Sequence, residues 1–311
     1  MPALPRLLIF TTRQRRNTFR AMRAGAGRHG YRIELIGYEQ AVRRWHLPGG
    51  AAIFTDFERM SPPWLEVAAR LHARVKAAGA PVLNDPTRFL PRAALLKALH
   101  REGINRFTCW LPALGEVPER FPVFLRTLWA HRGVIGDLLE GPDAAAAALK
   151  SALEEGHTLS DLAFIEYTGV AEQNGVFRKL SGYGVGDAII PGLTVSDHHW
   201  VAKSGVEGAA GAEAYAADHA ALEPWPHDGL VRRVMAVTGM EFGRVDFAAS
   251  QSGHAVFELN TNPYIRAVRN HPDPNRLKTS AWIETRLHES LADLARQGAG
   301  TGRIDLRAAF G

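Results

Sequence analysis

The pattern of apolar and polar positions divides the chain into two parts near residue 85. In the first part, short and almost wholly apolar runs alternate with stretches of helical periodicity. Continuous apolar runs are typical of strands buried on both faces of a parallel sheet. The pattern predicts strands at 6–11, 31–36, 51–54 and 81–83, and helices at 17–29 and 63–78. This β-α-β order predicts a small, open, parallel N-terminal domain over residues 1–85.

After residue 85 the pattern changes to helices, separate short strands and hairpins. Turn residues predict two hairpins, one around Gly186-Asp187 and one around residues 251–253. Other elements are expected at 91–102, 121–126, 143–155, 162–167, 230–238 and 280–296. We therefore expect an α/β (α+β) protein whose second domain spans 86–296. Its smaller subdomain should cover about 105–185 and its larger one 186–296, followed by a flexible tail at 297–311.

Composition narrows the class of protein. The chain of 311 residues is 46% hydrophobic and 22% charged, which is typical of a globular protein. No apolar run reaches the length of about 18 residues that a membrane span needs, so no membrane association is expected. The N-terminus lacks the features of a secretory signal. The single cysteine, Cys109, cannot form an internal disulfide, and the cytoplasm is the expected location.

Positive charge is concentrated at the N-terminus. Residues 1–50 hold ten arginines against only Glu34 and Glu39, so this part carries +8 and the remainder sums to −3 within a total of +5. Such a surface can attract nucleic acid, an anionic membrane or an acidic small molecule. Because no zinc-finger spacing or RNA-binding aromatic motif accompanies it, solvated arginines are the simpler reading and no nucleic-acid partner is expected.

The last predicted hairpin carries the most informative chemistry. If its turn is centred on Ser252, antiparallel pairing places Asp246 opposite Glu258 and Arg244 opposite Asn260 on one face. Two carboxylates about 5 Å apart repel each other unless a proton or a cation lies between them. With an amide oxygen they provide the hard oxygen ligands that Mg²⁺ prefers. The other face carries only apolar side chains: Val245, Phe247, Phe257 and Leu259.

A solvated hairpin face with an internal ion pair could produce the same pattern. The residues that follow favour the chemical interpretation, because GRVDF and then FELNTNPY resemble the metal-binding end of the ATP-grasp enzymes. The resemblance implies that Asp246, Glu258 and Asn260 bind two Mg²⁺ ions, or Mn²⁺, that bridge the phosphates of ATP. It makes Arg244 the catalytic residue that stabilises the transition state. Asn262 takes the place of a residue that contacts substrate or phosphate.

The resemblance extends from about residue 83 to 294. It implies that Lys97, on the helix after Asn84-Asp85-Pro86, reaches the ATP phosphates. Arg126 ends a strand where the family usually has a lysine that contacts phosphate, and arginine keeps the charge with a different geometry. Residues 131–136 resemble the glycine-bearing lid over the phosphates.

Further residues are assigned by the same resemblance. Glu166 and Tyr167 end a strand that resembles the edge of the adenine pocket. The acid that usually holds the ribose would fall on Lys179, so the ribose contact stays unassigned, and Arg178 and Lys179 become contacts to phosphate or substrate. Residues 193–205 resemble a segment beside the active site, which makes Trp200 and Lys203 candidates for substrate contacts. The adjacent His198 and His199 are expected at the surface.

The N-terminal domain offers two substrate contacts at the carboxyl ends of its strands, where open sheets place ligands. Arg13 lies in the loop after the first strand, and Asp56 follows the third. The resemblance implies an ATP- and Mg²⁺-dependent ligase of the carboxylate–amine type. Such an enzyme acts on small-molecule carboxylates and amines through an acylphosphate and releases ADP and phosphate. Relatives are often dimers or tetramers, and the resemblance allows a homodimer here.

Two alternatives keep the same fold. A small-molecule kinase would phosphorylate a hydroxyl group, and the basic loop after the first strand suits an anionic substrate of that kind. An ATP-binding module without turnover is favoured by Arg126 in place of lysine and by the missing ribose acid. The products distinguish the three, because only a ligase needs both an acid and an amine to release ADP and phosphate.

Overall fold

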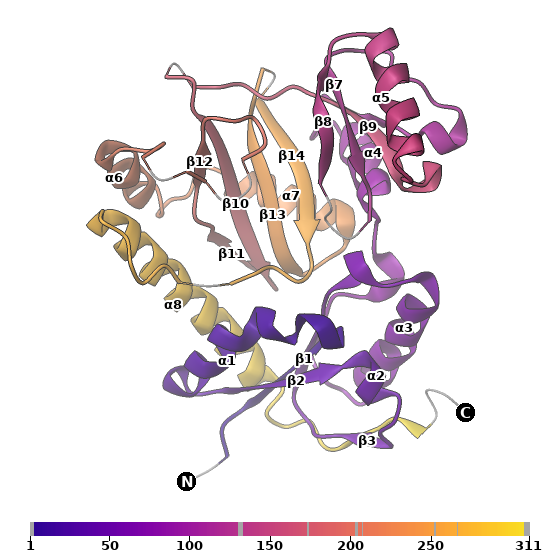
Figure 1. Ribbon diagram of the computed structural model, residues 1–311. Helices are drawn as coiled ribbons and strands as arrows, with labels where there is room; N and C mark the ends of the chain where they lie inside the picture. The colour runs from indigo at the N-terminus through magenta and orange to yellow at the C-terminus, as the bar shows by residue number, and fades with distance from the viewer. Residues whose placement is uncertain are drawn as a thin grey trace.

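The computed structural model describes residues 3–129, 133–172, 174–202, 205–206, 208–251, 253–265 and 267–307 (Figure 1). Its first part is a parallel sheet with the strand order β2-β1-β4-β5. The strands are β1 (Arg6–Thr11), β2 (Arg32–Gly37), β4 (Ala51–Phe54) and β5 (Val82–Leu83). The parallel N-terminal sheet predicted from the apolar runs is therefore confirmed.

Helices cover both faces of this sheet, which explains why residues 7–10 of β1 are all apolar. Leu8 and Phe10 share a core with α3, whereas Leu7 and Ile9 share another with α8. The helices around the sheet are α1 (Arg20–Ala26), α2 (Tyr38–Ala41), α3 (Pro62–Ala77) and α8 (Pro274–Gln297). The single helix predicted at 17–29 is instead α1 flanked by two 3₁₀ helices, Arg13–Phe19 and Gly27–His29.

A small antiparallel sheet with the order β6-β9-β7-β8 follows, joined to the first domain through α4 (Arg92–Arg101). Its strands are β6 (Cys109–Trp110), β7 (Val123–Thr127), β8 (Val134–Leu139) and β9 (Leu162–Glu166), and α5 (Pro142–Glu154) packs on it. Part of the lid predicted at 131–136 is strand β8, which pairs with β7. His131 and Arg132 of that lid lie outside the described residues.

A larger antiparallel sheet stands beside the small one (Figure 1). Its order is β11-β10-β13-β14, and β12 also pairs with β10. Its strands are β10 (Phe177–Val185), β11 (Ala188–Pro191), β12 (Val195–Asp197), β13 (Phe242–Ser250) and β14 (Gly253–Asn260). The helix α7 (Asp228–Thr238) covers one face, and α6 (Ala212–Ala220) packs on α8. Because β10 pairs with β13, it belongs to this sheet and not to the smaller subdomain, and the division falls between β9 and β10.

The informative hairpin is β13 and β14, and its register agrees with the prediction at the polar end. Asp246 pairs with Glu258, and Arg244 pairs with Asn260. A bulge after Asp246 then shifts the register, so that Phe247 pairs with Val256. One extra residue reverses the alternation of side chains beyond it. Phe257, expected on the apolar core face, therefore turns to the opposite side, and the fully buried Val256 takes its place.

A buried asparagine fixes the N-terminal sheet against the large sheet. Asn84 adopts a left-handed conformation with φ 67° after β5. Its Oδ1 accepts hydrogen bonds from the backbone N–H groups of Glu241 and Phe242, at 2.9 and 2.8 Å. Its Nδ2 donates to the carbonyl oxygens of Phe54 and Phe242, at 3.0 and 2.8 Å. All four amide interactions are satisfied by backbone groups from both domains.

The C-terminal segment returns to the N-terminal domain. The strand β15 (Ile304–Asp305) pairs with β3 (His46–Leu47), and Ile304 and Leu306 are buried. Part of the segment expected to be a flexible tail thus packs on the N-terminal domain through these two apolar side chains. Among the described residues, no helix combines the length and the apolar character that crossing a membrane requires.

Candidate functional site

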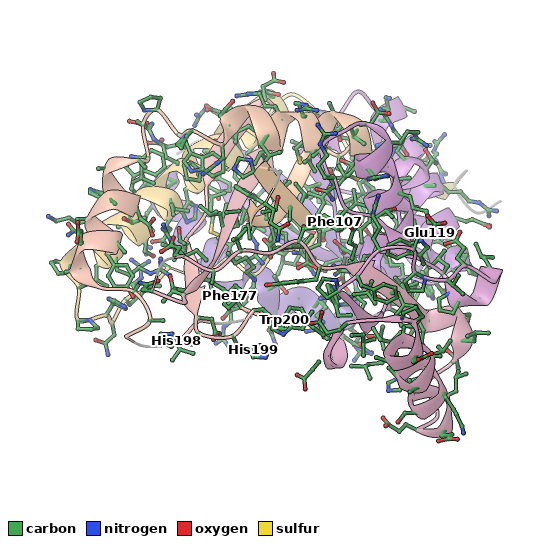
Figure 2. All side chains as sticks on the ribbon, turned by 90° about the horizontal axis from the view of Figure 1, so that it is seen from above. Phe107, Glu119, Phe177, His198, His199 and Trp200 are labelled. Carbon is green, nitrogen blue, oxygen red and sulfur yellow. The ribbon has the colours of Figure 1, made fainter. Side chains whose placement is uncertain are left out.

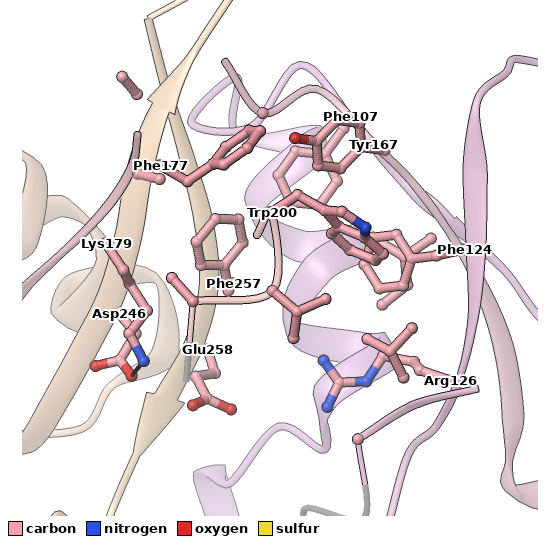
Figure 3. A pocket seen from close by; sticks show the side chains of 18 of the residues that line it. Phe107, Phe124, Arg126, Tyr167, Phe177, Lys179, Trp200, Asp246, Phe257 and Glu258 are labelled. Atoms are coloured by element: carbon pink, nitrogen blue, oxygen red, sulfur yellow. Dashed lines mark ion pairs between the residues drawn. The ribbon is translucent and has the colours of Figure 1, made fainter. Parts of the chain in front are cut away.

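A cavity of about 340 Å³ lies between the small and the large sheet. Both sheets, α4 and the segment around Trp200 contribute to its wall. Figure 3 shows that one end is lined by aromatic rings and the other by charged groups. The aromatic rings are Phe107, Phe124, Tyr167, Phe177, Trp200 and Phe257. The charged side chains are Arg92, Arg126, Arg178, Lys179, Asp246 and Glu258.

Trp200 follows β12 of the large sheet and packs against two rings on the side of the small sheet. Its ring centroid lies 5.0 Å from that of Phe124 on β7 and 5.2 Å from that of Tyr167, which directly follows β9. Burial raises the pKa of Tyr167, so its hydroxyl stays neutral. In Figure 2, His198 and His199 lie at the outer margin of the molecule, and both are exposed, as expected. A flat apolar slot of this kind suits a planar aromatic ligand.

The charged end begins with Asp246, which is almost completely buried on β13. Lys179 on the neighbouring β10 places Nζ 3.6 Å from Asp246 Oδ2. Arg244 donates from Nε and Nη2 to the two carboxylate oxygens, at 2.6 and 2.9 Å. Burial lowers the pKa of Arg244, but the Asp246 carboxylate and the Tyr183 hydroxyl together outweigh burial and raise it. Arg244 is a fixed cation at the edge of the cavity and not one of its lining residues.

Glu258 lies opposite Asp246 and has its own partners. Arg92 of α4 donates from Nη2 to Glu258 Oε2 and from Nη1 to the carbonyl of Phe257, the latter at 3.2 Å. Asn260 donates from Nδ2 to Glu258 Oε1 at 3.0 Å. Residues far apart in the chain thus converge on one carboxylate. Arg92 was not among the predicted site residues, and its contact with Glu258 is visible only in the structure, where it lies on the face of α4 toward β14.

Arg126 faces this group from the small sheet (Figure 3). Burial and, to a smaller extent, the nearby Arg92 lower its pKa to about 9, while Glu258 opposes the shift. At neutral pH the guanidinium therefore remains charged. Four cations, Arg92, Arg126, Arg178 and Lys179, line the cavity against the two described acids, so its charged end is suited to a polyanion.

Two predicted cofactor contacts lie outside the cavity. Lys97 is 39% exposed at its side chain and binds both oxygens of Glu116, at 2.6 and 2.7 Å. It lies five positions after Arg92, about 140° around the helix, so both cannot face the cavity. Glu166 pairs with Arg120 at 2.8 Å and accepts a hydrogen bond from the Thr108 N–H at 3.3 Å. Tyr167, the next residue, does line the cavity.

Arg178 lines the cavity but also reaches outward. Its guanidinium pairs with Glu172 at 3.3 Å and with Asp218 of α6. Lys179, by contrast, turns to Asp246. Lys203, predicted to contact substrate, lies outside the described residues.

The remaining predicted substrate contacts include both buried and exposed side chains. Asp56 is fully buried and accepts hydrogen bonds from Thr12 Oγ1 and, at 2.6 Å, from Arg59 Nη1. Asn262 is buried and donates to Thr11 Oγ1 at 3.3 Å. In the part of the chain that the structure describes, no hydrogen-bond donor reaches Asn262 Oδ1. Arg13 is exposed.

The donor set on the hairpin can be tested against a metal ion. The described residues contain no group of three or more His, Cys, Asp or Glu side chains placed to hold one. Asp246 and Glu258 are paired across the hairpin, and Asn260 adjoins Glu258, so two carboxylates and one amide oxygen face the same side. This oxygen chemistry fits Mg²⁺.

Comparison with known proteins adds evidence at the level of structure. No model of a known family matches the chain, and no curated protein matches it in sequence. Solved structures do match. The RimK domain ATP-grasp protein from Sphaerobacter thermophilus is 16% identical, with a TM-score of 0.51, over 94% of this chain and 99% of its own.

Two further solved structures are similar over nearly the whole chain. D-alanine–D-alanine ligase from Bacillus anthracis, complexed with ATP, is 15% identical, with a TM-score of 0.55 and 99% of both chains covered. The ATP-grasp ligase PsnB, complexed with a precursor variant, Mg and ADP, is 12% identical. Its TM-score is 0.57, over 95% of this chain and 98% of its own. Similarity over nearly the whole chain to these ATP-grasp structures shows that the chain has the ATP-grasp fold.

Proposed function

We propose that this protein is an ATP- and Mg²⁺-dependent ligase of the ATP-grasp superfamily that joins a carboxylate to an amine. One observation carries the proposal. A single cavity between the two sheets has an aromatic end and a cationic end, and the Asp246–Glu258 pair lies at the latter. That division matches the two parts of a nucleotide, a planar base and a charged triphosphate.

Different lining residues would bind different parts of the nucleotide. Trp200, Phe124 and Tyr167 would hold the adenine ring. Arg92, Arg126 and Lys179 would meet the phosphates, where arginine adds bidentate contacts. Asp246, Glu258 and Asn260 would hold Mg²⁺, and the ion would offset phosphate charge and align the terminal phosphate. The cations now paired with the carboxylates could then turn to the nucleotide.

The proposed reaction has two steps. A carboxylate oxygen takes the terminal phosphoryl group of ATP, which gives an acylphosphate and ADP. The amine nitrogen then attacks the carbonyl carbon and loses a proton as the bond between carbon and the phosphate oxygen breaks, which releases phosphate. Arg244 would stabilise the negative charge on the carbonyl oxygen in the second step, because its guanidinium is already fixed by Asp246.

The solved structures support this proposal by what their names state. One similar protein joins two D-alanine molecules and was solved with ATP, and another is a ligase solved with Mg and ADP. The single cysteine is buried, and burial raises the pKa of its thiol to about 11. An unreactive thiol of this kind fits a mechanism without a covalent enzyme intermediate and suits the cytoplasmic location that we propose.

A binding module without turnover is the second candidate. The described lining of the cavity holds only Asp246 and Glu258 as acids, both at the charged end, so no acid is present there for the ribose. ADP release tests the choice. We expect ADP and phosphate only when an acid and an amine are supplied together, and no product from Glu258→Gln. A phosphorylated acceptor without free phosphate would indicate a kinase, and Mg–ATP binding without ADP would indicate the module.

A further inference from the structure

A second cavity of about 310 Å³ lies in the N-terminal domain, away from the nucleotide cavity. Thr12, directly after β1, and Tyr38, directly after β2, line it at the carboxyl ends of the parallel strands. The buried Tyr38 hydroxyl donates to the carbonyl of Thr55 at 2.8 Å and so has a fixed position. The carboxyl ends of the strands are where open parallel sheets bind ligands. A volume of this size accommodates a small molecule.

The two cavities border the same narrow space. A narrow space of about 40 Å³ has Arg92 and Glu258 in common with the nucleotide cavity. It has Trp129 in common with the N-terminal cavity. Trp129 borders both the N-terminal cavity and the narrow space that reaches Glu258, so a molecule that extended past this side chain would point one end toward Glu258. The reacting end of a substrate would arrive where the triphosphate is proposed to lie.

Two charged side chains lie in the wall of the N-terminal cavity. Arg59 and Glu39 both line the cavity. Arg59 Nε and Glu39 Oε2 are buried, and within the described part of the chain neither has a hydrogen-bond partner. Asp56 holds Arg59 by Nη1 at 2.6 Å, which orients the guanidinium. Both side chains carry charge at the cavity wall: the Arg59 guanidinium suits a carboxylate, and the Glu39 carboxylate suits an N–H group.

Two tryptophans complete the site. Trp64, at the start of α3, and Trp129, after β7, line the same cavity from different domains. They are 37% and 42% exposed, and large aromatic side chains at a cavity mouth commonly grip an apolar or aromatic group. Trp129 is held in place by its backbone N–H, which donates to Asp161 Oδ1 at 2.7 Å.

We propose that this cavity selects the amine substrate, a short peptide whose last residue is aromatic. The terminal carboxylate binds Arg59, the peptide N–H donates to Glu39, and the aromatic side chain lies between Trp64 and Trp129. The free amino end then extends toward Arg92 and Glu258. The proposal rests on the ligase function proposed above and adds the substrate class.

Binding to the protein loaded with Mg²⁺ and a non-hydrolysable ATP analogue tests the inference by calorimetry. The probes are glycyl-phenylalanine in both hands, glycyl-alanine, and glycyl-phenylalanine amide, which lacks the carboxylate. We expect glycyl-phenylalanine of one hand to bind roughly tenfold more tightly than glycyl-alanine and than its own amide. Trp64→Ala should lose about that factor and Trp64→Phe should retain most of it, while the analogue binds all variants alike.

Trp45→Ala is the matched control, because Trp45 is 72% exposed and lines none of these cavities. Equal affinity for all the probes, or no binding of any, with the analogue still bound, would overturn the inference and leave the ligase proposal intact. An equal loss in Trp45→Ala and Trp64→Ala would overturn it as well. If the ATP analogue itself does not bind, the proposed function fails, and the substrate assignment fails with it.

Discussion

At the scale of single residues, only some of the basic side chains near the nucleotide cavity line its charged end. Arg92 and Lys97 belong to the same helix, but only Arg92 lines the cavity. The resemblance selected Lys97, because residue type and spacing alone cannot tell which side of a helix faces a ligand. Contact with Glu258 assigns that place to Arg92.

The two helix positions make a matched pair of variants. Arg92→Gln should weaken Mg–ATP binding by about tenfold or more, because it removes a buried cation beside the proposed phosphate site. Lys97→Gln should leave the affinity within about twofold, because its partner Glu116 lies outside the cavity. Calorimetric titration with a non-hydrolysable analogue measures both. A larger loss for Lys97→Gln than for Arg92→Gln would reverse the assignment.

Arg126 offers a second test at this scale. Arg126→Ala should weaken nucleotide binding by about tenfold or more, whereas Arg126→Lys should keep most of it, because the positive charge remains. The same titration serves for both variants. Unchanged affinity in Arg126→Ala would remove this residue from the phosphate site.

At the scale of elements, the β13–β14 hairpin combines a correct prediction with an error. Alternation and a turn sufficed to pair Asp246 with Glu258. The bulge could not be foreseen, because nothing in the local sequence marks the extra residue, and it redirected Phe257 from the core to the cavity. Phe107 was missed for a similar reason, since it reaches the cavity from a loop without periodicity.

The contact between α8 and the segment that precedes β2 predicts a pH dependence of stability. His288 of α8 is fully buried, its Nδ1 lies 2.8 Å from the Tyr31 hydroxyl, and its ring stacks on His29 at 4.2 Å. Burial lowers its pKa to about 4, with His29 and Arg28 adding to the shift. Between pH 6.5 and 4 the unfolded chain takes up a proton that the folded one rejects. The free energy of unfolding should therefore decrease as the pH is lowered from 6.5 to 4, by about 3 kcal/mol in all.

Urea unfolding at pH 7 and pH 5 measures this effect. His288→Gln should be less stable than the wild type at pH 7 but should show a smaller loss on acidification, because the titrating group is gone. An equally steep loss in the variant would show that other groups cause it.

At the scale of the whole molecule, the N-terminal domain and the large sheet form one continuous core. Leu8 and Phe10 of β1 share it with Val245 of β13. The apolar runs and the FELN segment were enough to predict the parallel domain and the ATP-grasp fold. The contact between the two domains was not predictable, because Asn84 and Thr261 bind partners that are distant in sequence. Glu58, for example, accepts from both the N–H and the hydroxyl of Thr261.

The contact between the two domains can be probed at Asn84. Asn84→Ala removes four hydrogen bonds to buried backbone groups and should cost about 3 kcal/mol or more of unfolding free energy. Asn17→Ala, at an exposed position, is the control and should change stability by about 0.5 kcal/mol or less. Chemical denaturation compares them, and equal stabilities would show that Asn84 does not fix the domains together.

The central claim is that the Asp246–Glu258 face of the hairpin binds Mg²⁺ together with ATP, and the Mg²⁺ dependence of ATP binding tests it most directly. The account predicts that Mg²⁺ strengthens ATP binding to the wild type by about tenfold or more and has little effect on Glu258→Gln. Equal affinity for ATP with and without Mg²⁺ in the wild type, or an unchanged Mg²⁺ effect in Glu258→Gln, would contradict it.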